Sequence, residues 1–221
     1  MSEKAFISSL KNIIPENFID DDCAVIPVYK YFTKDRKNPF GCVDCGPYML
    51  ISTDTLNEDV HFSLDYFSLE DVGYKSLAVN LSDIAACGGI PLFISVSITV
   101  PPYLSEEKLR CIYNGFKILT DRFNVILTGG DTVKGEKLSI TITIIGKTEK
   151  PLMRKNANLN DYIYVTGSLG GSAYSLSLLL NQEKPKEHLL EKHLRPFPRL
   201  DIVNELLTKY HISSCIDISD G

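Results

Sequence analysis

Apolar residues recur along the chain at two spacings, and each spacing predicts one kind of secondary structure. Repeats of three or four residues mark one face of a helix, and they predict helices at 6–14, 69–84 and 105–119. Alternating and β-branched runs are typical of strands, and they predict strands at 23–29, 48–53, 93–100, 125–128 and 138–147. The first 150 residues therefore alternate between strands and helices, with a polar loop at 31–47.

The hydrophobic pattern changes near Lys150 and Pro151, where a polar stretch begins. Beyond it, the pattern predicts strands at 162–166 and 215–218 and helices at 172–180 and 201–210. We place a domain boundary here and expect 1–150 to form one domain and 151–221 to form the first part of a second. A strand and a turn with no element after them are a poor end for a domain, so we expect the second domain to be incomplete.

The composition is that of an ordinary globular protein, and it argues against two classes of partner. The 28 acidic residues outnumber the 23 basic ones, giving a net charge of -5, whereas proteins that bind nucleic acid usually carry a basic face. The longest apolar stretch, 92–100, is interrupted by Ser and Thr and is too short to span a bilayer. Residues 1–6 lack the basic start and apolar run of a secretory signal. We therefore expect a cytoplasmic protein without nucleic-acid or membrane partners.

The six cysteines are scattered through the chain, which is typical of reduced, structural thiols rather than of a disulfide framework. Cys42 and Cys45 form a C-x-x-C pair. A zinc site would need a second pair of ligands close by, and the nearest candidates, such as His61, do not form one. A solvated loop is the simpler interpretation of this pair, with zinc or redox chemistry as the alternative.

Aspartates occur at four places where an apolar element meets a small-residue turn. These places hold the sequences Asp20-Asp21-Asp22, Ser52-Thr53-Asp54, Gly129-Gly130-Asp131 and Asp217-Ile-Ser-Asp220. A fifth aspartate, Asp83, lies on the apolar face of the 69–84 helix, where an unpaired carboxylate is costly to bury. Any one of them is more often a cap or a turn residue than a ligand. Five together, without Cys or His clusters, suit a hard cation such as Mg²⁺ held with substrate phosphates.

Other features of the sequence bear on nucleotide chemistry less directly. The segment 130–135 imitates a P-loop but lacks the lysine and hydroxyl that such a loop requires. His61 follows Asp54 by a short loop, and it is either a substrate contact or an ordinary loop residue. The other three histidines are most simply surface residues: His188, His193 and His211.

Several motifs occur together in one order from about Asp20 to Gly221. They are Ser52-Thr-Asp-Thr-Leu, Val60-His61-Phe62, Lys75-Ser-Leu-Ala-Val-Asn-Leu-Ser-Asp-Ile-Ala-Ala86, Gly129-Gly-Asp-Thr132, Arg154 before Asp161-Tyr-Ile-Tyr-Val-Thr-Gly167, His193-Leu-Arg-Pro196 and Ile216-Asp-Ile-Ser-Asp-Gly221. In this combination the chain closely resembles thiamine-monophosphate kinase. That family belongs to a superfamily with aminoimidazole ribonucleotide synthetase, selenophosphate synthetase and a hydrogenase maturation factor.

The resemblance implies a fold, a reaction and a set of site residues. The fold is α+β: an N-terminal mixed-sheet domain with helices on one face, which dimerises through its strands, followed by a C-terminal α+β domain. The reaction transfers the γ-phosphoryl of ATP to thiamine monophosphate, giving thiamine diphosphate and ADP, with several Mg²⁺ ions in a homodimer. By position, Asp54, Asp131 and Arg154 would act in catalysis; Gly130, Asp131, Arg154 and Ser219 would contact ATP; and His61 would contact the substrate. The magnesium ligands would be Asp22, Ser52, Thr53, Asp54, Asp83, Asp131, Asp217 and Asp220.

Two departures from the family pattern leave alternatives open. Asp20 replaces the glycine of the family's Gly-Asp-Asp, and family members usually continue beyond Gly221 with residues that grip the thiamine ring. A truncated, non-catalytic Mg-ATP-binding and dimerisation module is therefore one alternative to an active kinase. Another ATP-dependent enzyme of the superfamily is the second. Selenophosphate synthetase is disfavoured, since it would need a reactive cysteine beside a lysine in an N-terminal glycine-rich loop.

Overall fold

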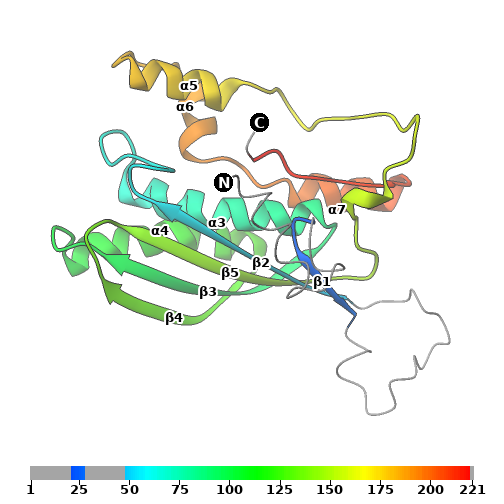
Figure 1. Ribbon diagram of the computed structural model, residues 1–221, viewed down its shortest axis with the longest axis horizontal. Helices are drawn as coiled ribbons and strands as arrows, with labels where there is room; N and C mark the ends of the chain where they lie inside the picture. The colour runs from blue at the N-terminus through cyan, green and yellow to red at the C-terminus, as the bar shows by residue number, and fades with distance from the viewer. Residues whose placement is uncertain (1–20, 28–47, 220–221) are drawn as a thin grey trace, which may run out of the picture.

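The computed structural model describes residues 21–27 and 48–219, and at its centre is a five-stranded sheet (Figure 1). The strand order is β1-β2-β5-β3-β4, and neighbours are antiparallel except β3 and β4, which are parallel. The mixed sheet expected for the N-terminal domain is confirmed. The helix expected at 6–14, the Cys42 and Cys45 pair and Asp220 lie outside the described residues. The strands are β1 (Ala24–Pro27), β2 (Tyr48–Asn57), β3 (Ile90–Val100), β4 (Ile126–Lys134) and β5 (Ser139–Thr148).

Two long helices, α3 (Leu69–Ala86) and α4 (Glu106–Phe123), cover one face of the sheet (Figure 1). Both confirm the helices predicted from apolar spacing. Each follows a serine whose side chain accepts a hydrogen bond from the first turn, Ser68 for α3 and Ser105 for α4. These serines define the helix starts because their hydroxyls satisfy backbone N–H groups that have no partner within the helix.

The hydrophobic core lies between these helices and the sheet. Alternate isoleucines of β5 are fully buried there, in one cluster with Leu77 of α3 and Phe116 of α4. Gly73 lets the two helices approach closely, since a Cβ at this position would lie 2.0 Å from the carbonyl oxygen of Ile112. The helix that carries Asp83 is therefore held firmly against both the sheet and its neighbouring helix.

The opposite face of the sheet carries hydroxyl groups. The Oγ1 atoms of Thr53 and Thr143 lie 3.0 Å apart, and those of Thr55 and Thr141 lie 2.8 Å apart. We call this side the open face, because both Thr53 and Thr55 are exposed. Every residue of the edge strand β4 is also exposed. Dimerisation through the strands stays a prediction.

Residues 151–219 add helices that pack above α3. Helix α7 packs against α3, with Leu200 and Val203 in the core, and α5 packs against α6. The helices α5 and α7 were predicted, whereas α6 was not. The domain boundary at 150 stays a prediction. The elements are the 3-10 turn η2 (Arg154–Asn156), α5 (Gly171–Leu180), α6 (Glu187–Leu194) and α7 (Leu200–Lys209).

Two strands predicted in this second part are wrong. Residues 162–166 and 215–218 have no regular secondary structure. Tyr162, Ile163 and Tyr164 are 86%, 92% and 86% exposed. A strand is held by hydrogen bonds to a neighbouring strand, and among the described residues neither segment pairs with another.

Two other strands are longer than predicted, which changes the setting of two candidate ligands. Strand β2 continues to Asn57 because it pairs with β5 as far as Ser139. Asp54 therefore lies within the strand and not at its end. Strand β4 continues to Lys134 because it pairs with β3, so Asp131 lies within a strand instead of in a turn that follows one.

Candidate functional site

Three aspartates from distant parts of the chain converge near the end of α3. Asp22 precedes β1, Asp83 lies in the last turns of α3, and Asp217 lies in the segment after α7. One carboxylate oxygen from each lies within 4.8 Å of the other two. Carboxylates this close repel one another unless protons or a cation neutralise them. This carboxylate cluster, Asp22, Asp83 and Asp217, has the oxygen ligands and the spacing that suit a divalent cation.

Asp83 is a carboxyl group in an apolar setting, only 8% exposed. Its pKa is raised to about 8, first by burial and then by the charges of Asp54 and Asp217. The Ser52 hydroxyl donates a hydrogen bond to Asp83 at 2.5 Å and acts in the opposite direction. Burial, followed by the charge of Asp22, raises the pKa of Asp217 to about 6. Because a cation favours ionised carboxylates, the cluster is suited to exchange protons for a metal ion near neutral pH.

Arg154 joins this cluster from the second part of the chain. Its guanidinium forms an ion pair with Asp22, whose side chain is 4% exposed. Its backbone N–H donates to Asp21 Oδ1 at 2.8 Å. The Ser214 hydroxyl donates to the Arg154 carbonyl oxygen at 3.1 Å, which ties Arg154 to the segment that carries Asp217. The Arg154 side chain remains 39% exposed, so it is accessible to an anionic ligand beside the carboxylates.

Asp54 lies on the helix-facing side of β2, on the same side as Ser52. Its backbone N–H donates to Asn80 Oδ1 at 3.2 Å, and Asn80 Nδ2 in turn donates to the Ser76 carbonyl oxygen at 2.9 Å. Asn80 is fully buried, and the sequence analysis assigned it no role. The sequence did indicate a role for Asn80, because an amide on the apolar face of a helix must find hydrogen-bond partners.

Gly130 and Asp131 lie apart from the carboxylate cluster, on the edge strand β4. The register aligns Asp54 with Gly130 across β5 and β3, and three strand spacings amount to about 14 Å. Asp131 is exposed and pairs with Ser97. Only glycine fits at position 130, since a Cβ there would lie 1.6 Å from the Val96 carbonyl oxygen. Within one chain, the β4 residues and the cluster form two separate groups.

The remaining predicted site residues are dispersed. Thr53 is exposed on the open face, on the side of β2 away from Ser52. Ser219 is exposed, two residues beyond Asp217. His61 follows β2, its Nδ1 accepts a hydrogen bond from the Asn57 N–H at 3.0 Å, and its side chain lines a cavity.

His193 is buried, so its prediction as a surface residue is wrong. It is 6% exposed, and its Nδ1 lies 3.0 Å from Ser172 Oγ. Burial, and then the nearby Lys75 ammonium, lower the pKa of His193 to about 4. The imidazole is therefore neutral near pH 7. Its burial was missed because α6, the helix that carries it, was not predicted.

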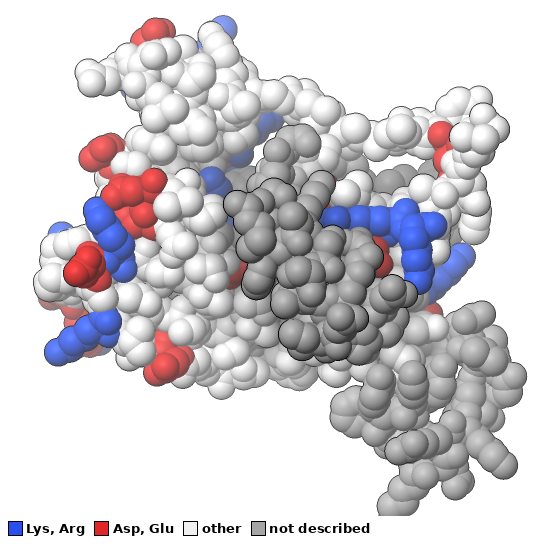
Figure 2. Space-filling view, in the orientation of Figure 1, with Lys and Arg blue, Asp and Glu red and all other residues white. Residues whose placement is uncertain are grey.

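In the view of Figure 2, basic and acidic side chains lie beside one another at the left end of the molecule, and most of the other described surface in that view is uncharged. Among the helices that the structure describes, none has the length and apolar character required to cross a membrane.

Comparison with known sequences identifies the relatives of this chain. The family described as AIR synthase related protein, N-terminal domain, matches residues 20–148. A thiamine-monophosphate kinase of Bacillus subtilis is 43% identical over 185 residues, which cover 80% of this chain and 57% of the relative. A thiamine-monophosphate kinase of Aquifex aeolicus is 32% identical over 225 residues, which cover 100% of this chain and 67% of the relative.

Solved structures show the same relationship. A structure of AaThiL complexed with AMPPCP and TMP matches with a TM-score of 0.84 at 33% identity, covering 99% of this chain and 66% of that chain. Thiamine monophosphate kinase from Aquifex aeolicus matches with a TM-score of 0.81, covering 100% of this chain and 68% of that one. The chain thus spans between about half and two thirds of the length of its relatives. It belongs to the thiamine-monophosphate kinase family, among the proteins that share the AIR synthase related N-terminal domain.

Proposed function

We propose that the protein catalyses the magnesium-dependent transfer of the γ-phosphoryl group of ATP to thiamine monophosphate, giving thiamine diphosphate and ADP. The observation that carries the proposal is the carboxylate cluster with Ser52 and Arg154 beside it. Family membership supports the choice of substrates, since relatives carry the name thiamine-monophosphate kinase and one was solved with AMPPCP and TMP.

The residue types suit this reaction. The acceptor is itself a phosphate and is largely ionised near neutral pH, so the site needs no strong general base. When bound, magnesium supplies positive charge that offsets the repulsion between the two polyanions. Asp22, Asp83 and Asp217 would hold the metal, with the Ser52 hydroxyl beside them. Arg154 would bind a phosphate oxygen and help align the attacking and leaving oxygens.

The rest of the predicted site is part of the same proposal. Thr53, Asp54, Asp131 and Asp220 are further magnesium ligands, Gly130, Asp131, Arg154 and Ser219 contact ATP, and His61 contacts thiamine monophosphate. Residues 1–150 form the domain that carries most of these residues, in a cytoplasmic homodimer. The fully exposed edge strand β4 supports the choice of the strands as the dimer contact, because an unpaired edge favours pairing with another chain.

The test is thiamine diphosphate formation by the 221-residue chain, with Mg²⁺ and with EDTA, beside a thermal shift with Mg-ATP. We expect magnesium-dependent product from the unaltered chain and from Asp121→Asn, an exposed control. Asp83→Asn should give none. Equal product from Asp83→Asn would contradict the role of the cluster. A Mg-ATP shift without product would favour the non-catalytic binding module.

A further inference from the structure

The segment 211–219, which carries Asp217, has little backbone support of its own. It has no regular secondary structure, and in the described part of the chain we find no backbone-to-backbone hydrogen bond that involves it. Ile212 and Cys215 pack against the core but are only partly buried. Because an irregular segment loses much conformational freedom when it is fixed, side chains must help to hold Asp217 in place. We call 211–219 the Asp217 segment.

Two serine hydroxyls of the Asp217 segment provide this support. The Ser213 hydroxyl donates to Asp161 Oδ2 at 2.6 Å, and the Ser214 hydroxyl donates to the Arg154 carbonyl oxygen at 3.1 Å. The two acceptors lie 52 and 60 residues earlier in the chain. At the right of Figure 1, the yellow-green turn η2 lies beside the red segment that follows α7. We call these two hydrogen bonds the serine clamp.

Asp161 is the side chain that accepts the shorter bond of the serine clamp. Its Oδ2 also accepts from the Asn158 N–H at 2.8 Å, and its own N–H donates to the Asn158 carbonyl oxygen at 3.2 Å. These bonds close a turn in which Asn160 has a φ of 75°, a conformation that asparagine tolerates. The hydrogen bonds from Ser213 and then from Asn158 lower the pKa of Asp161. The carboxylate is therefore ionised near neutral pH, and an ionised acceptor forms the stronger hydrogen bond.

The serine clamp completes a closed ring of contacts at the candidate metal site. The Arg154 guanidinium pairs with Asp22, and Asp22 is hydrogen-bonded to Asp217. Asp217 follows Ser214 by three residues, and Ser214 donates back to the Arg154 carbonyl oxygen. Because three residues span at most about 11 Å, a displacement of the clamp also displaces the Asp217 carboxylate.

The serine clamp lies near the surface, where its contribution to the stability of the fold is small. Asp161 and Asn158 are exposed, and Ser213 and Ser214 are half-buried. A hydrogen bond in such a place adds little to stability, because water replaces a lost partner. The clamp therefore affects the position of Asp217 more than it affects the free energy of unfolding.

We propose that Asp161 is a positioning residue for the metal site, because through the serine clamp it holds the Asp217 segment against the turn that carries Arg154. This inference rests on the proposed function, in which Asp217 holds magnesium and Arg154 binds a phosphate oxygen. It adds residues that act through these two. The metal ligand and the phosphate-binding cation are then arranged before their ligands arrive, so less order has to be imposed on binding.

The test is calorimetric titration of the 221-residue chain with Mg²⁺ alone. Asp161→Ala removes the acceptor of Ser213 and should weaken Mg²⁺ binding by about tenfold, which is typical for loss of a group that orients a metal ligand. Asp161→Asn removes the charge but keeps an accepting oxygen, so its affinity should stay within about threefold of that of the unaltered chain. The midpoint of urea denaturation in EDTA should be the same for both variants and for the unaltered chain.

A double variant separates the serine clamp from other effects of the same residues. Ser213→Ala removes the hydrogen-bond donor without changing any charge, and it should weaken Mg²⁺ binding about as much as Asp161→Ala does. Both single variants break the same hydrogen bond. The double variant should therefore bind Mg²⁺ no more weakly than Asp161→Ala alone, whereas independent effects would add.

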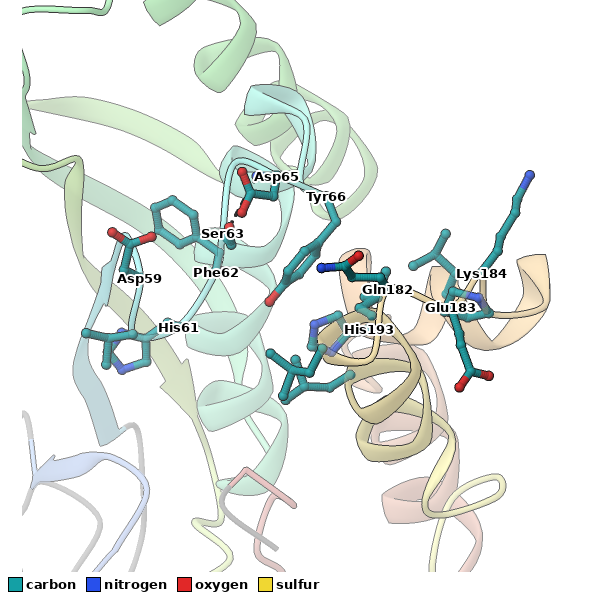
Figure 3. A pocket seen from close by; sticks show the side chains of 16 residues that line it. Asp59, His61, Phe62, Ser63, Asp65, Tyr66, Gln182, Glu183, Lys184 and His193 are labelled. Carbon is teal, nitrogen blue, oxygen red and sulfur yellow. Dashed lines mark hydrogen bonds between the residues drawn. The ribbon is translucent and has the colours of Figure 1, made fainter.

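Asp65→Ala is the matched control for the loss of an exposed loop aspartate. Asp65 lines a cavity of about 810 Å³, together with His61 and Tyr66 (Figure 3). Lys75 donates to the His61 carbonyl oxygen at 3.4 Å and precedes Asp83 by eight residues, which is about 12 Å along α3. Asp65 thus lies at the other end of α3 from the carboxylate cluster, and its loss should change Mg²⁺ affinity by less than about twofold.

The inference and the proposed function fail in distinguishable ways. If thiamine diphosphate forms but Asp161→Ala binds Mg²⁺ as the unaltered chain does, the reaction is right and the inference is wrong. If the affinities follow the predicted order but no product forms, the inference is right and the reaction is wrong. Equal losses in Asp161→Ala and Asp161→Asn would overturn the inference, because the lost charge alone would then explain them. Absence of Mg²⁺ binding to the unaltered chain would contradict both.

Discussion

The aspartates predicted as ligands fall into two regions that are formed in different ways. Asp22, Asp83 and Asp217 are far apart in sequence, yet they meet at the end of α3 within 4.8 Å. Asp131 lies on the edge strand β4, exposed and on a strand three places away from β2. The first group is assembled by packing within one chain, and the second is placed on a surface. A shared residue type therefore does not imply a shared site within a single subunit.

The largest expected difference between the two regions is in metal binding without nucleotide. We expect Asp83→Asn to lower the affinity of the chain for Mg²⁺ by at least about a hundredfold, because it removes one of the three ligands of the carboxylate cluster. Asp131→Asn should lower that affinity far less, since in the described part of one chain Asp131 belongs to no group of three or more ligating side chains. Calorimetric titration with Mg²⁺ alone measures both. Equal losses would mean that the two regions form one metal site.

The second difference concerns stability without metal. In EDTA we expect Asp83→Asn to stabilise the fold by about 1 to 3 kcal/mol, and Asp131→Asn to change it by less than about 0.5 kcal/mol. The pKa of Asp83 is raised to about 8 from its ordinary 3.8, so folding favours its protonated form. The stability that this proton gives is complete below pH 3.8 and is lost as pH rises through 8.

Urea denaturation at pH 5 and pH 8.5 checks this prediction. The advantage of Asp83→Asn should grow from the lower to the higher pH, because the unaltered carboxyl ionises over this range. Asp131→Asn provides the control at both pH values. If the difference in free energy of unfolding between Asp83→Asn and the unaltered chain is the same at both pH values, the buried charge of Asp83 is not what destabilises the metal-free fold.

The helix-facing region was largely predictable from the sequence. The apolar spacing from Leu69 to Ile84 predicted α3, and Asp83 on that apolar face indicated a carboxylate that is paired or bound to a metal. That Asp22 and Asp217 meet Asp83 does not follow from local pattern, because packing of distant segments brings them together. The family resemblance supplied that grouping, and the cluster itself was found in the structure.

The parts that were predicted wrongly depend on non-local pairing. Strands β2 and β4 extend past Asp54 and Asp131 because partner strands continue beside them. The strand propensity of a threonine or a glycine does not show whether a partner strand lies beside it. The segment 162–166 has strand-like residues but no described strand beside it. His193 was misjudged because burial on a short helix such as α6 is determined by what packs onto it.

The third prediction concerns the buried imidazole of His193. The pKa of His193 is lowered to about 4 from its ordinary 6.5, so the unfolded chain binds a proton in this range while the folded chain does not. Stability is therefore lost as pH falls from 6.5 to 4, by about 3 kcal/mol from this residue. His193→Gln should lose less stability than the unaltered chain between pH 7 and pH 4 in urea denaturation. Parallel losses would show that His193 is protonated in the folded state.

The smallest effect compares two neighbours on opposite sides of β2. Ser52 donates to the buried Asp83 at 2.5 Å, whereas the hydroxyl of Thr53 meets Thr143 on the exposed open face. Ser52→Ala should destabilise the metal-free chain by about 1 kcal/mol, because a buried carboxyl loses a hydrogen bond. Thr53→Val should change stability by less than about 0.5 kcal/mol, since water replaces an exposed partner.

Urea denaturation of both variants in EDTA measures this difference, with Thr55→Val as a second open-face control. A cost for Thr53→Val equal to that of Ser52→Ala would mean that the open face is covered in solution, as it would be in a dimer formed through the strands. Dilution should then reduce the cost of Thr53→Val and leave that of Ser52→Ala unchanged, because only the former would depend on a second copy of the chain.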